Sequence, residues 1–255
     1  MLACVGAPLS AAAAEDVPPA WSAAIGPGVQ RLPAWSGART YRQLPVPYAA
    51  FTWSDRVELS TLDGLSVDLA HRKPWHGGVY GDYRRGRSRD ELGALAGRIN
   101  SLTFALYGGA YLEFDATSSL AVGTRLLHDL LRSGTRAEAY VASDLPRLGW
   151  LMQSIQLTAT AADAAVENRF FGIATPWAAR LDVAPYRAGG GWQQIALDYS
   201  AFQPTSVHTG IALNLEYAHL VGTAADSPLV RRFGRRAQPS VSVALIYHTS
   251  SAHDP

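Results

Sequence analysis

The chain has 255 residues, a net charge of +1, 48% hydrophobic residues and only 17% charged residues, whereas ordinary soluble domains carry about 25% charged residues. The near-neutral charge excludes a protein that binds nucleic acid through a strongly basic surface. The single cysteine, Cys4, excludes a disulfide framework and a metal site built from several thiolates.

Residues 1–14 form an uncharged run of small and apolar residues that ends in three alanines before Glu15. This pattern predicts the remnant of a signal peptide, followed by a single mature domain over residues 15–255. After residue 14 no window of 18 apolar residues occurs, so no transmembrane helix is predicted. Export without a helical anchor leaves a periplasmic protein, a secreted protein or an outer-membrane β-barrel.

Apolar and polar residues alternate through most of the remaining chain, which is the period of a half-buried β-strand. In Ile211 to Tyr217, for example, isoleucine, leucine and tyrosine occupy one face, and alanine, asparagine and glutamate the other. The same pattern predicts twelve strands, over residues 21–31, 41–53, 56–62, 65–71, 77–85, 103–114, 119–129, 135–144, 149–159, 191–202, 205–219 and 237–248. Residues 92–100 and 177–186 stay unassigned.

Two prolines, Pro45 and Pro47, fall on one face of the predicted second strand. Proline cannot donate a hydrogen bond to a β-ladder. We therefore expect this strand to bend or to end early.

The connections between the predicted strands fall into two lengths. Short turns are predicted at Ser54-Asp55, 115–118, 145–148 and Gln203-Pro204, and long loops at 86–102, 160–190 and 220–236. From the sixth strand onward short and long alternate, apart from the short connection 130–134. This sorting is typical of outer-membrane barrels. It predicts an all-β fold, an antiparallel transmembrane β-barrel of about twelve strands in the bacterial outer membrane. Its short turns are periplasmic, its long loops lie outside, and residues 249–255 form a tail.

The polar faces of the predicted strands carry ten charged residues: Glu58, Asp68, Asp82, Arg84, Glu113, Arg125, Arg136, Glu138, Asp198 and Glu216. In a soluble sandwich this face would look outward, and alternation alone does not distinguish the two folds. In a lipid bilayer the charges must point into the lumen, where they are expected to pair with one another or with water. Acids outnumber arginines in this set, so an open lumen is expected to prefer cations.

Several segments together resemble one protein family. They are Ile25-Gly26-Pro27-Gly28-Val29, Pro33 to Gly37, Leu44 to Tyr48, Phe170-Phe171-Gly172-Ile173, Ala184 to Gly191, and Ala224 to Val230, which contains Asp226, Ser227 and Pro228. The chain resembles the MltA-interacting protein (MipA/OmpV) family of Gram-negative outer-membrane proteins. The resemblance implies a β-barrel and, in the best-known branch, a scaffold that links a murein-cleaving lytic transglycosylase to a murein synthase. It carries over no catalytic residue.

The last of these segments lies in the predicted outer loop 220–236. Asp226, Ser227 and Pro228 have turn chemistry, because Asp and Ser bond to nearby backbone and Pro ends ladder pairing. No base is placed beside Ser227 by the spacing. Four arginines follow: Arg231, Arg232, Arg235 and Arg236. Guanidinium groups suit phosphate, so we expect them to contact the phosphates of lipopolysaccharide; a solvated loop is the plainer alternative.

The sequence therefore predicts no enzyme, cofactor, metal or nucleic-acid partner, since it contains neither a HExxH nor a GxSxG motif. The expected role is a scaffold for murein-remodelling enzymes, with outer-membrane lipid, lipopolysaccharide, a lytic transglycosylase and a murein synthase as partners. A narrow channel for small solutes is the alternative. An outer-membrane hydrolase is the third hypothesis, because the residues of a catalytic triad need not be contiguous.

Overall fold

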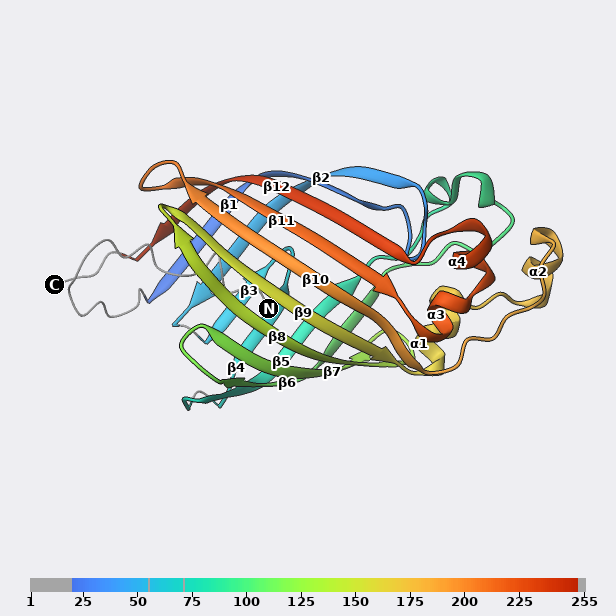
Figure 1. Ribbon diagram of the computed structural model, residues 1–255, viewed down its shortest axis with the longest axis horizontal. Coiled ribbons are helices and arrows are strands. Elements are labelled where there is room, and N and C mark those ends of the chain that lie inside the picture. Colours follow the sequence, from blue (N-terminus) through green and yellow to red (C-terminus); the bar gives the residue numbers. More distant parts are fainter. Residues whose placement is uncertain (1–19, 55, 71, 252–255) are drawn as a thin grey trace.

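Twelve antiparallel strands form one closed barrel (Figure 1), in a computed structural model that describes residues 20–54, 56–70 and 72–251. Each strand pairs with its neighbours in sequence, and β1 (Trp21–Pro33) pairs with β12 (Ala237–Ser250) to close the ring. The others are β2 (Tyr41–Trp53), β3 (Val57–Ser60), β4 (Gly64–Asp68), β5 (Trp75–Arg84), β6 (Ala105–Asp115), β7 (Leu120–Asp129), β8 (Thr135–Leu148), β9 (Leu151–Ala162), β10 (Gly191–Pro204) and β11 (Thr209–Leu220). The prediction of a twelve-stranded antiparallel barrel is confirmed.

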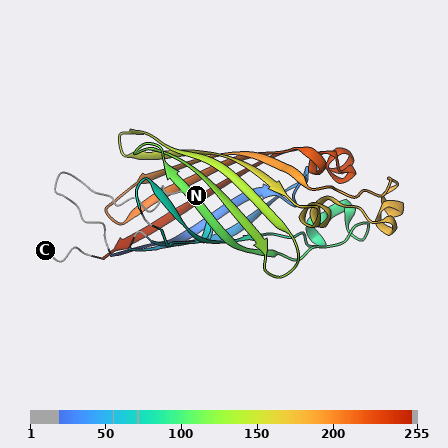
Figure 2. The ribbon, with the colours of Figure 1, turned by 90° about the horizontal axis from the view of Figure 1, so that it is seen from below.

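The two ends of the barrel differ, as Figures 1 and 2 show. At the turn end, β1 begins, β12 ends and the strands are joined by short connections such as 116–119 and 205–208. At the loop end, long connections fold into short helices: the 3₁₀ helix η1 (Asp90–Leu95), α1 (Ala164–Phe171), α2 (Thr175–Leu181), α3 (Gly222–Asp226) and α4 (Pro228–Phe233). None of the helices in the described part of the chain has the length and apolar character that a membrane-spanning helix needs.

The predicted long loops 160–190 and 220–236 thus contain short helices. Of the segments left unassigned, η1 covers 92–95 and α2 covers 177–181. Each helix is too short for a hydrophobic period to show in the sequence, so its stability comes from packing and end capping. Asp163, for example, caps α1 by accepting a hydrogen bond from the backbone N–H of Val166 at 2.9 Å.

An apolar band surrounds the outside of the barrel. Its side chains are 40–60% exposed and include Ile25, Leu59, Val79, Leu112, Leu126, Val141, Leu157, Ile195, Ile211 and Leu245. Water-soluble monomers rarely expose an apolar surface of this extent, whereas a lipid bilayer solvates it. Exposed tryptophans mark both borders of the band, with Trp21, Trp53, Trp75 and Trp150 at the turn end and Trp192 at the loop end, as in the aromatic girdles of membrane barrels.

The second strand neither bends away nor ends early, so the expectation based on its prolines is wrong. It pairs with β1 from Tyr41 to Trp53. On its other side it pairs with β3 only over Ala50–Trp53, and Ala49 still bonds Thr61. Because backbone N–H directions alternate along a strand, Pro45 and Pro47 face the same side as Ala49. They lie beyond the end of the β3–β4 hairpin, where an edge strand tolerates the missing donor.

The hairpin of β3 and β4 is shorter than the predicted strands 56–62 and 65–71. Gly64 turns the chain at φ +84°, and a Cβ there would come within 2.2 Å of the carbonyl oxygen of Gly81. The barrel wall is therefore shorter at β3 and β4 than at the other strands. An ion pair between Arg42 of β2 and Glu91 of η1 holds the β5–β6 connection over the gap that the hairpin leaves.

Three strand ends differ from the predictions because proline or polar residues interrupt the alternation without interrupting the strand. A register shift between Leu145 and Leu148 lets β8 continue past Pro146, so the turn predicted at 145–148 lies at 149–150. Likewise β10 runs through Pro204, and the turn follows at 205–208. Thr249 and Ser250, predicted as the start of a tail, belong to β12; residues 1–14 and 252–255 lie outside the described residues.

Candidate functional site: the lumen network and the plug at the loop end

One side of the lumen is filled by a network centred on Arg136 of β8. Its guanidinium group is buried and contacts Asp82 Oδ2 of β5 at 2.5 Å and Glu138 Oε1 at 3.2 Å. It also lies over the ring of Tyr107, 4.7 Å from the centroid. Buried charges are tolerated only when they are paired in this way.

A second arginine, Arg125 of β7, shares Glu138 with Arg136. Its Nη1 lies 3.3 Å from Glu138 Oε2, and its guanidinium group is sandwiched between the rings of Tyr80 and Tyr140 at 4.5 and 4.4 Å. The Tyr140 hydroxyl in turn donates to Glu113 at 2.7 Å. Two arginines and their acids thus pair within the wall from β5 to β8.

Nearer the turn end, His76 of β5 joins two carboxylates. Its Nδ1 lies 3.0 Å from Asp68 Oδ2 and its Nε2 lies 3.0 Å from Asp115 Oδ2. Asp68 also accepts from the backbone N–H of Gly77. No motif in the sequence points to a site at His76, although strand alternation places it on the same inward face as Asp68.

The remaining lumen residues of the predicted set lie apart from this network. Arg84 donates to Gln193 at 2.8 Å and stacks on the ring of Phe170 at 3.9 Å, which places it beneath α1. Glu58 lies on the inward face of the short strand β3. Asp198 and Glu216 are register partners on β10 and β11. The structure therefore places the ten charged residues on the inner face but distributes them among separate clusters.

At the loop end of the barrel, residues 163–190 and 221–236 pack against the wall and form a structure that we call the plug. Its side chains form one apolar core with the barrel wall, made up of Tyr80, Ala105, Tyr107, Tyr111, Leu127, Ala162, Val166, Phe170, Phe171, Ala188, Leu220, Ala224, Ala225 and Val230. A second core joins Trp35 and Leu92 of the neighbouring connections to Leu181 and Leu229 of the plug. The long connections are thus packed over the barrel mouth.

Asp226, Ser227 and Pro228 belong to the last of the segments that resemble the family. They form the junction of α3 and α4 rather than a solvated turn. Ser227 is fully buried, and its hydroxyl donates to the carbonyl oxygen of Phe171 at 2.6 Å. Ser227 Oγ also accepts a hydrogen bond from the backbone N–H of Leu229 at 3.3 Å and so caps α4, whose first residue is Pro228. Asp226 is exposed and pairs with Arg236 at 3.2 Å. Ser227 therefore fastens α4 to α1.

The four arginines of this segment lie on or near the outer surface of the plug but do not form one uniform cluster. Arg232 pairs with Asp182 at 3.6 Å, and Arg236 pairs with Asp226. Arg235 stacks on the ring of Tyr41 at 4.8 Å, while Arg231 is exposed. Both acid pairs are exposed, so their net contribution to stability is small.

Two charged groups are buried in or against the plug. Arg87, at the start of the β5–β6 connection, donates to the carbonyl oxygens of Asn100 at 3.0 Å and Phe170 at 2.9 Å. Burial lowers the pKa of Arg87 to about 10, so it stays charged at neutral pH. Glu167 of α1 is fully buried and accepts from Gln193 Nε2 at 2.7 Å.

We expect the plug to lose stability as the pH rises from acid to neutral. Burial raises the pKa of the Glu167 carboxyl above its ordinary value of about 4.3, and hydrogen bonds from Gln193 and Thr223 and the charge of Arg84 offset this only in part. The folded plug therefore binds this proton more tightly than the unfolded chain. The resulting stabilisation is complete below the ordinary pKa and is lost as the pH rises through the raised pKa.

Amide hydrogen exchange in α1 and α3, corrected for the intrinsic pH dependence of exchange, measures this effect. Protection should fall between about pH 4 and the raised pKa in the wild type, and Glu167→Gln should flatten the profile. Protection that rises over this range would contradict the assignment.

A family model described as "MltA-interacting protein MipA" matches residues 25–249 of this chain. No curated protein matches it in sequence. Among solved structures, the NanC porin aligns with a TM-score of 0.44 and 10% identity over 88% of this chain and 98% of that one. OmpT of Vibrio cholerae aligns with a TM-score of 0.35 and 7% identity over 90% and 97% of the two chains. The Ralstonia pickettii toluene transporter TbuX aligns with a TM-score of 0.35 and 9% identity over 92% and 90%.

At such identities and scores, these structures say nothing about the function of this chain. The family match is different in kind, because it covers nearly the whole barrel and includes both the β1–β2 segment and the Ser227 junction. It confirms the resemblance drawn from these residues and, together with the closed barrel and its apolar band, indicates an outer-membrane protein. The chain belongs to the MltA-interacting protein MipA family.

Proposed function

We propose that this protein is a non-enzymatic outer-membrane scaffold that holds a lytic transglycosylase of the MltA kind, and through it a murein synthase, at the inner face of the membrane. The plug is the observation that supports this role best. Its apolar cores join the long connections to the barrel wall through packed side chains, which favours a rigid anchor over an open channel. The partner in this proposal approaches from the turn end, where the connections are short and the barrel wall is complete.

Co-purification tests the scaffold. The detergent-extracted barrel should retain purified MltA from the same bacterium on an affinity column. Val207, at the tip of the 205–208 connection, is 80% exposed, so Val207→Asp should weaken retention several-fold if the turn end is the docking face. Arg231→Gln, at the opposite end, is the matched control and should retain MltA fully. If MltA elutes freely from the folded wild-type barrel, the scaffold role is wrong.

A narrow channel for small solutes is the second candidate, favoured by a cavity of about 180 Å³ inside the lumen. Conductance measurements in a planar bilayer distinguish the scaffold from the channel. A plugged scaffold should show no steady conductance, whereas a solute channel should show it without any change to the plug. Turnover of lipid or ester substrates by the purified barrel would instead support the hydrolase hypothesis and contradict a non-enzymatic role.

The exposed arginines of the plug are proposed to contact lipopolysaccharide phosphates. Arg231 and Arg236 are the best placed, because the first is exposed and the second is held only by a surface pair with Asp226. We expect Arg231→Gln with Arg236→Gln to lower the affinity of the folded barrel for lipopolysaccharide by about tenfold in low salt. Binding to immobilised lipopolysaccharide measures this, with Arg72→Gln near the turn end as control. Unchanged affinity would leave these arginines as a solvated surface.

A further inference from the structure

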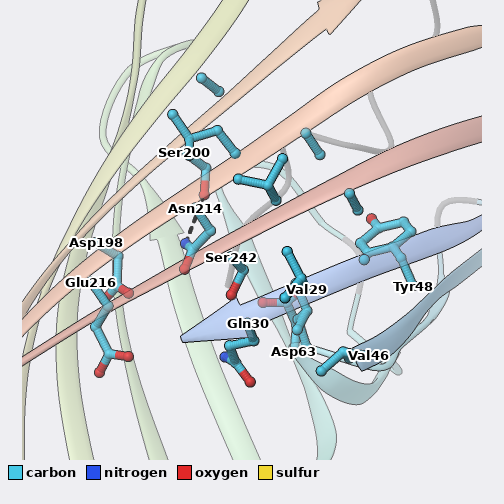
Figure 3. Close-up of a pocket in the computed structure, with 17 residues that line it drawn as sticks. Val29, Gln30, Val46, Tyr48, Asp63, Asp198, Ser200, Asn214, Glu216 and Ser242 are labelled. Carbon is cyan, nitrogen blue, oxygen red and sulfur yellow. Dashed lines mark hydrogen bonds between the residues drawn. The ribbon is translucent and has the colours of Figure 1, made fainter. Parts of the chain in front are cut away.

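The lumen contains a cavity of about 180 Å³ (Figure 3), lined mainly by strands on the other side of the ring from β5–β8. Side chains from β1, β2, β10, β11 and β12 and from the β3–β4 turn line it. The polar members of the lining are Gln30, Tyr48, Asp63, Asp198, Ser200, Asn214, Glu216 and Ser242, and none of the lining residues is Lys, Arg or His. The cavity therefore carries three carboxyl groups without a cationic side chain in its wall.

Two of these carboxyl groups are direct neighbours. Asp198 and Glu216 stand opposite each other in the β10–β11 register, and like charges at such positions destabilise a sheet. Figure 3 shows them together on one side of the cavity, with Asp63 set apart from them beside Val46. Elsewhere in the lumen, acids such as Asp82 and Glu138 are paired with arginine. Among the described residues no arginine or lysine forms an ion pair with Asp198 or Glu216, and only Asp63 is reached by the charge of an arginine, Arg125.

A buried hydroxyl group in the same wall also lacks a partner. Ser242 of β12 is only 8% exposed and is on the inward face, and its Oγ has no hydrogen bond to any described residue. A buried polar group of this kind is normally satisfied by protein, water or a ligand. Beside it, the Asn214 amide nitrogen donates to Ser200 Oγ at 3.0 Å, which leaves the Asn214 carbonyl oxygen as an acceptor. The cavity thus presents mainly hydrogen-bond acceptors.

We propose that this cavity binds a small organic cation with a primary ammonium group at each end, a linear diamine. One ammonium group would sit between Asp198 and Glu216 and the other near Asp63, with Ser242 and Asn214 accepting further N–H bonds. Short apolar side chains on the inward face of the lining, Val46, Ala212 and Ala244, would contact the methylene chain. A single metal ion fits less well, since no three His, Cys, Asp or Glu residues in the described chain come close enough to hold one.

This binding does not depend on the scaffold role, and it is tested on the folded, detergent-purified full chain by calorimetric titration with 1,5-diaminopentane. We expect saturable binding in low salt. Asp198→Asn with Glu216→Gln should weaken it by about tenfold or more, because each removes a charge-assisted hydrogen bond. Ser242→Ala should weaken it by a few-fold. Pentylamine, with one ammonium group, should bind more weakly than the diamine, and 1,5-pentanediol should not bind.

Glu58→Gln is the matched control, because it removes one inward acid that does not line the cavity. It should leave the affinity for the diamine unchanged, and every variant should keep the heat-dependent gel shift of a folded barrel. The proposal fails if the folded wild type gives no saturable signal. It also fails if Glu58→Gln and the Asp198→Asn, Glu216→Gln pair weaken binding equally, which would indicate only a general attraction of cations to an acidic lumen.

Discussion

Replacing Glu138 with glutamine is expected to lower the free energy of unfolding of the barrel by about 3–5 kcal/mol. Glu138 is the carboxylate shared by Arg125 and Arg136, both of which are buried. Glutamine has nearly the same shape but no charge. Arg136 would keep Asp82, but Arg125 would lose the one carboxylate recorded within 4 Å of its guanidinium group in the described residues. A buried guanidinium group without a counter-ion then accounts for the loss.

Urea unfolding of the barrel in detergent micelles, followed by tryptophan fluorescence, measures this change. Glu216→Gln is the control, since it alters another inward glutamate on the same sheet. Glu216 faces Asp198, and among the described residues its carboxylate accepts one hydrogen bond, from the hydroxyl of Ser240 at 3.0 Å. Removing its charge should change stability by less than about 1 kcal/mol, or raise it. If both variants lose the same stability, the arginine network does not hold the barrel together.

The second large effect is expected in the plug. Ser227→Ala should lower its local stability by about 2–4 kcal/mol, because it removes the cap of α4 and leaves the carbonyl oxygen of Phe171 buried without its 2.6 Å donor. The barrel strands do not depend on this bond. We therefore expect α1 and α4 to exchange amide hydrogens and to be cleaved by protease faster, while the barrel keeps its heat-dependent gel shift.

Asp226→Ala provides the comparison for this experiment. Asp226 precedes Ser227 directly, but it is exposed, and its ion pair in the described part of the chain is a surface pair with Arg236. Its removal should cost less than about 1 kcal/mol. Equal protection of the plug in Ser227→Ala and wild type would show that the two helices are held by apolar packing alone.

The barrel itself was predictable because the signal is local. Lipid on one face and a polar lumen on the other impose a period of two on each strand, and this period can be read without knowing which strands pair. The alternation of short and long loops was the second indication of an outer-membrane barrel. The prolines of β2 misled the prediction because the cost of a missing donor depends on whether a neighbouring strand is present, and β3 ends before it reaches Pro47.

The helices of the plug were missed for a different reason. Five to eight residues are too few to show a helical period, and these helices exist because wall residues such as Tyr107 and Leu127 cover them. Ser227 stood out in the sequence as part of a family segment, but its partner Phe171 is 56 residues away. The spacing along the chain therefore suggested a turn, and only the packing of α4 on α1 revealed a buried cap.

The sequence by itself determined that this chain forms a twelve-stranded barrel, which residues face the lumen, and which family it resembles, because alternation and short motifs are properties of neighbouring residues. The tertiary structure alone decided which charges meet. Arg136 reaches Asp82 across 54 residues, and Asp198 meets Glu216 rather than an arginine. These pairings follow from strand register and barrel closure, which are set by contacts between distant segments. Charges of the same inward face thereby became ion pairs around Arg125 and Arg136 on one side of the lumen, and the neighbouring acids Asp198 and Glu216 on the other.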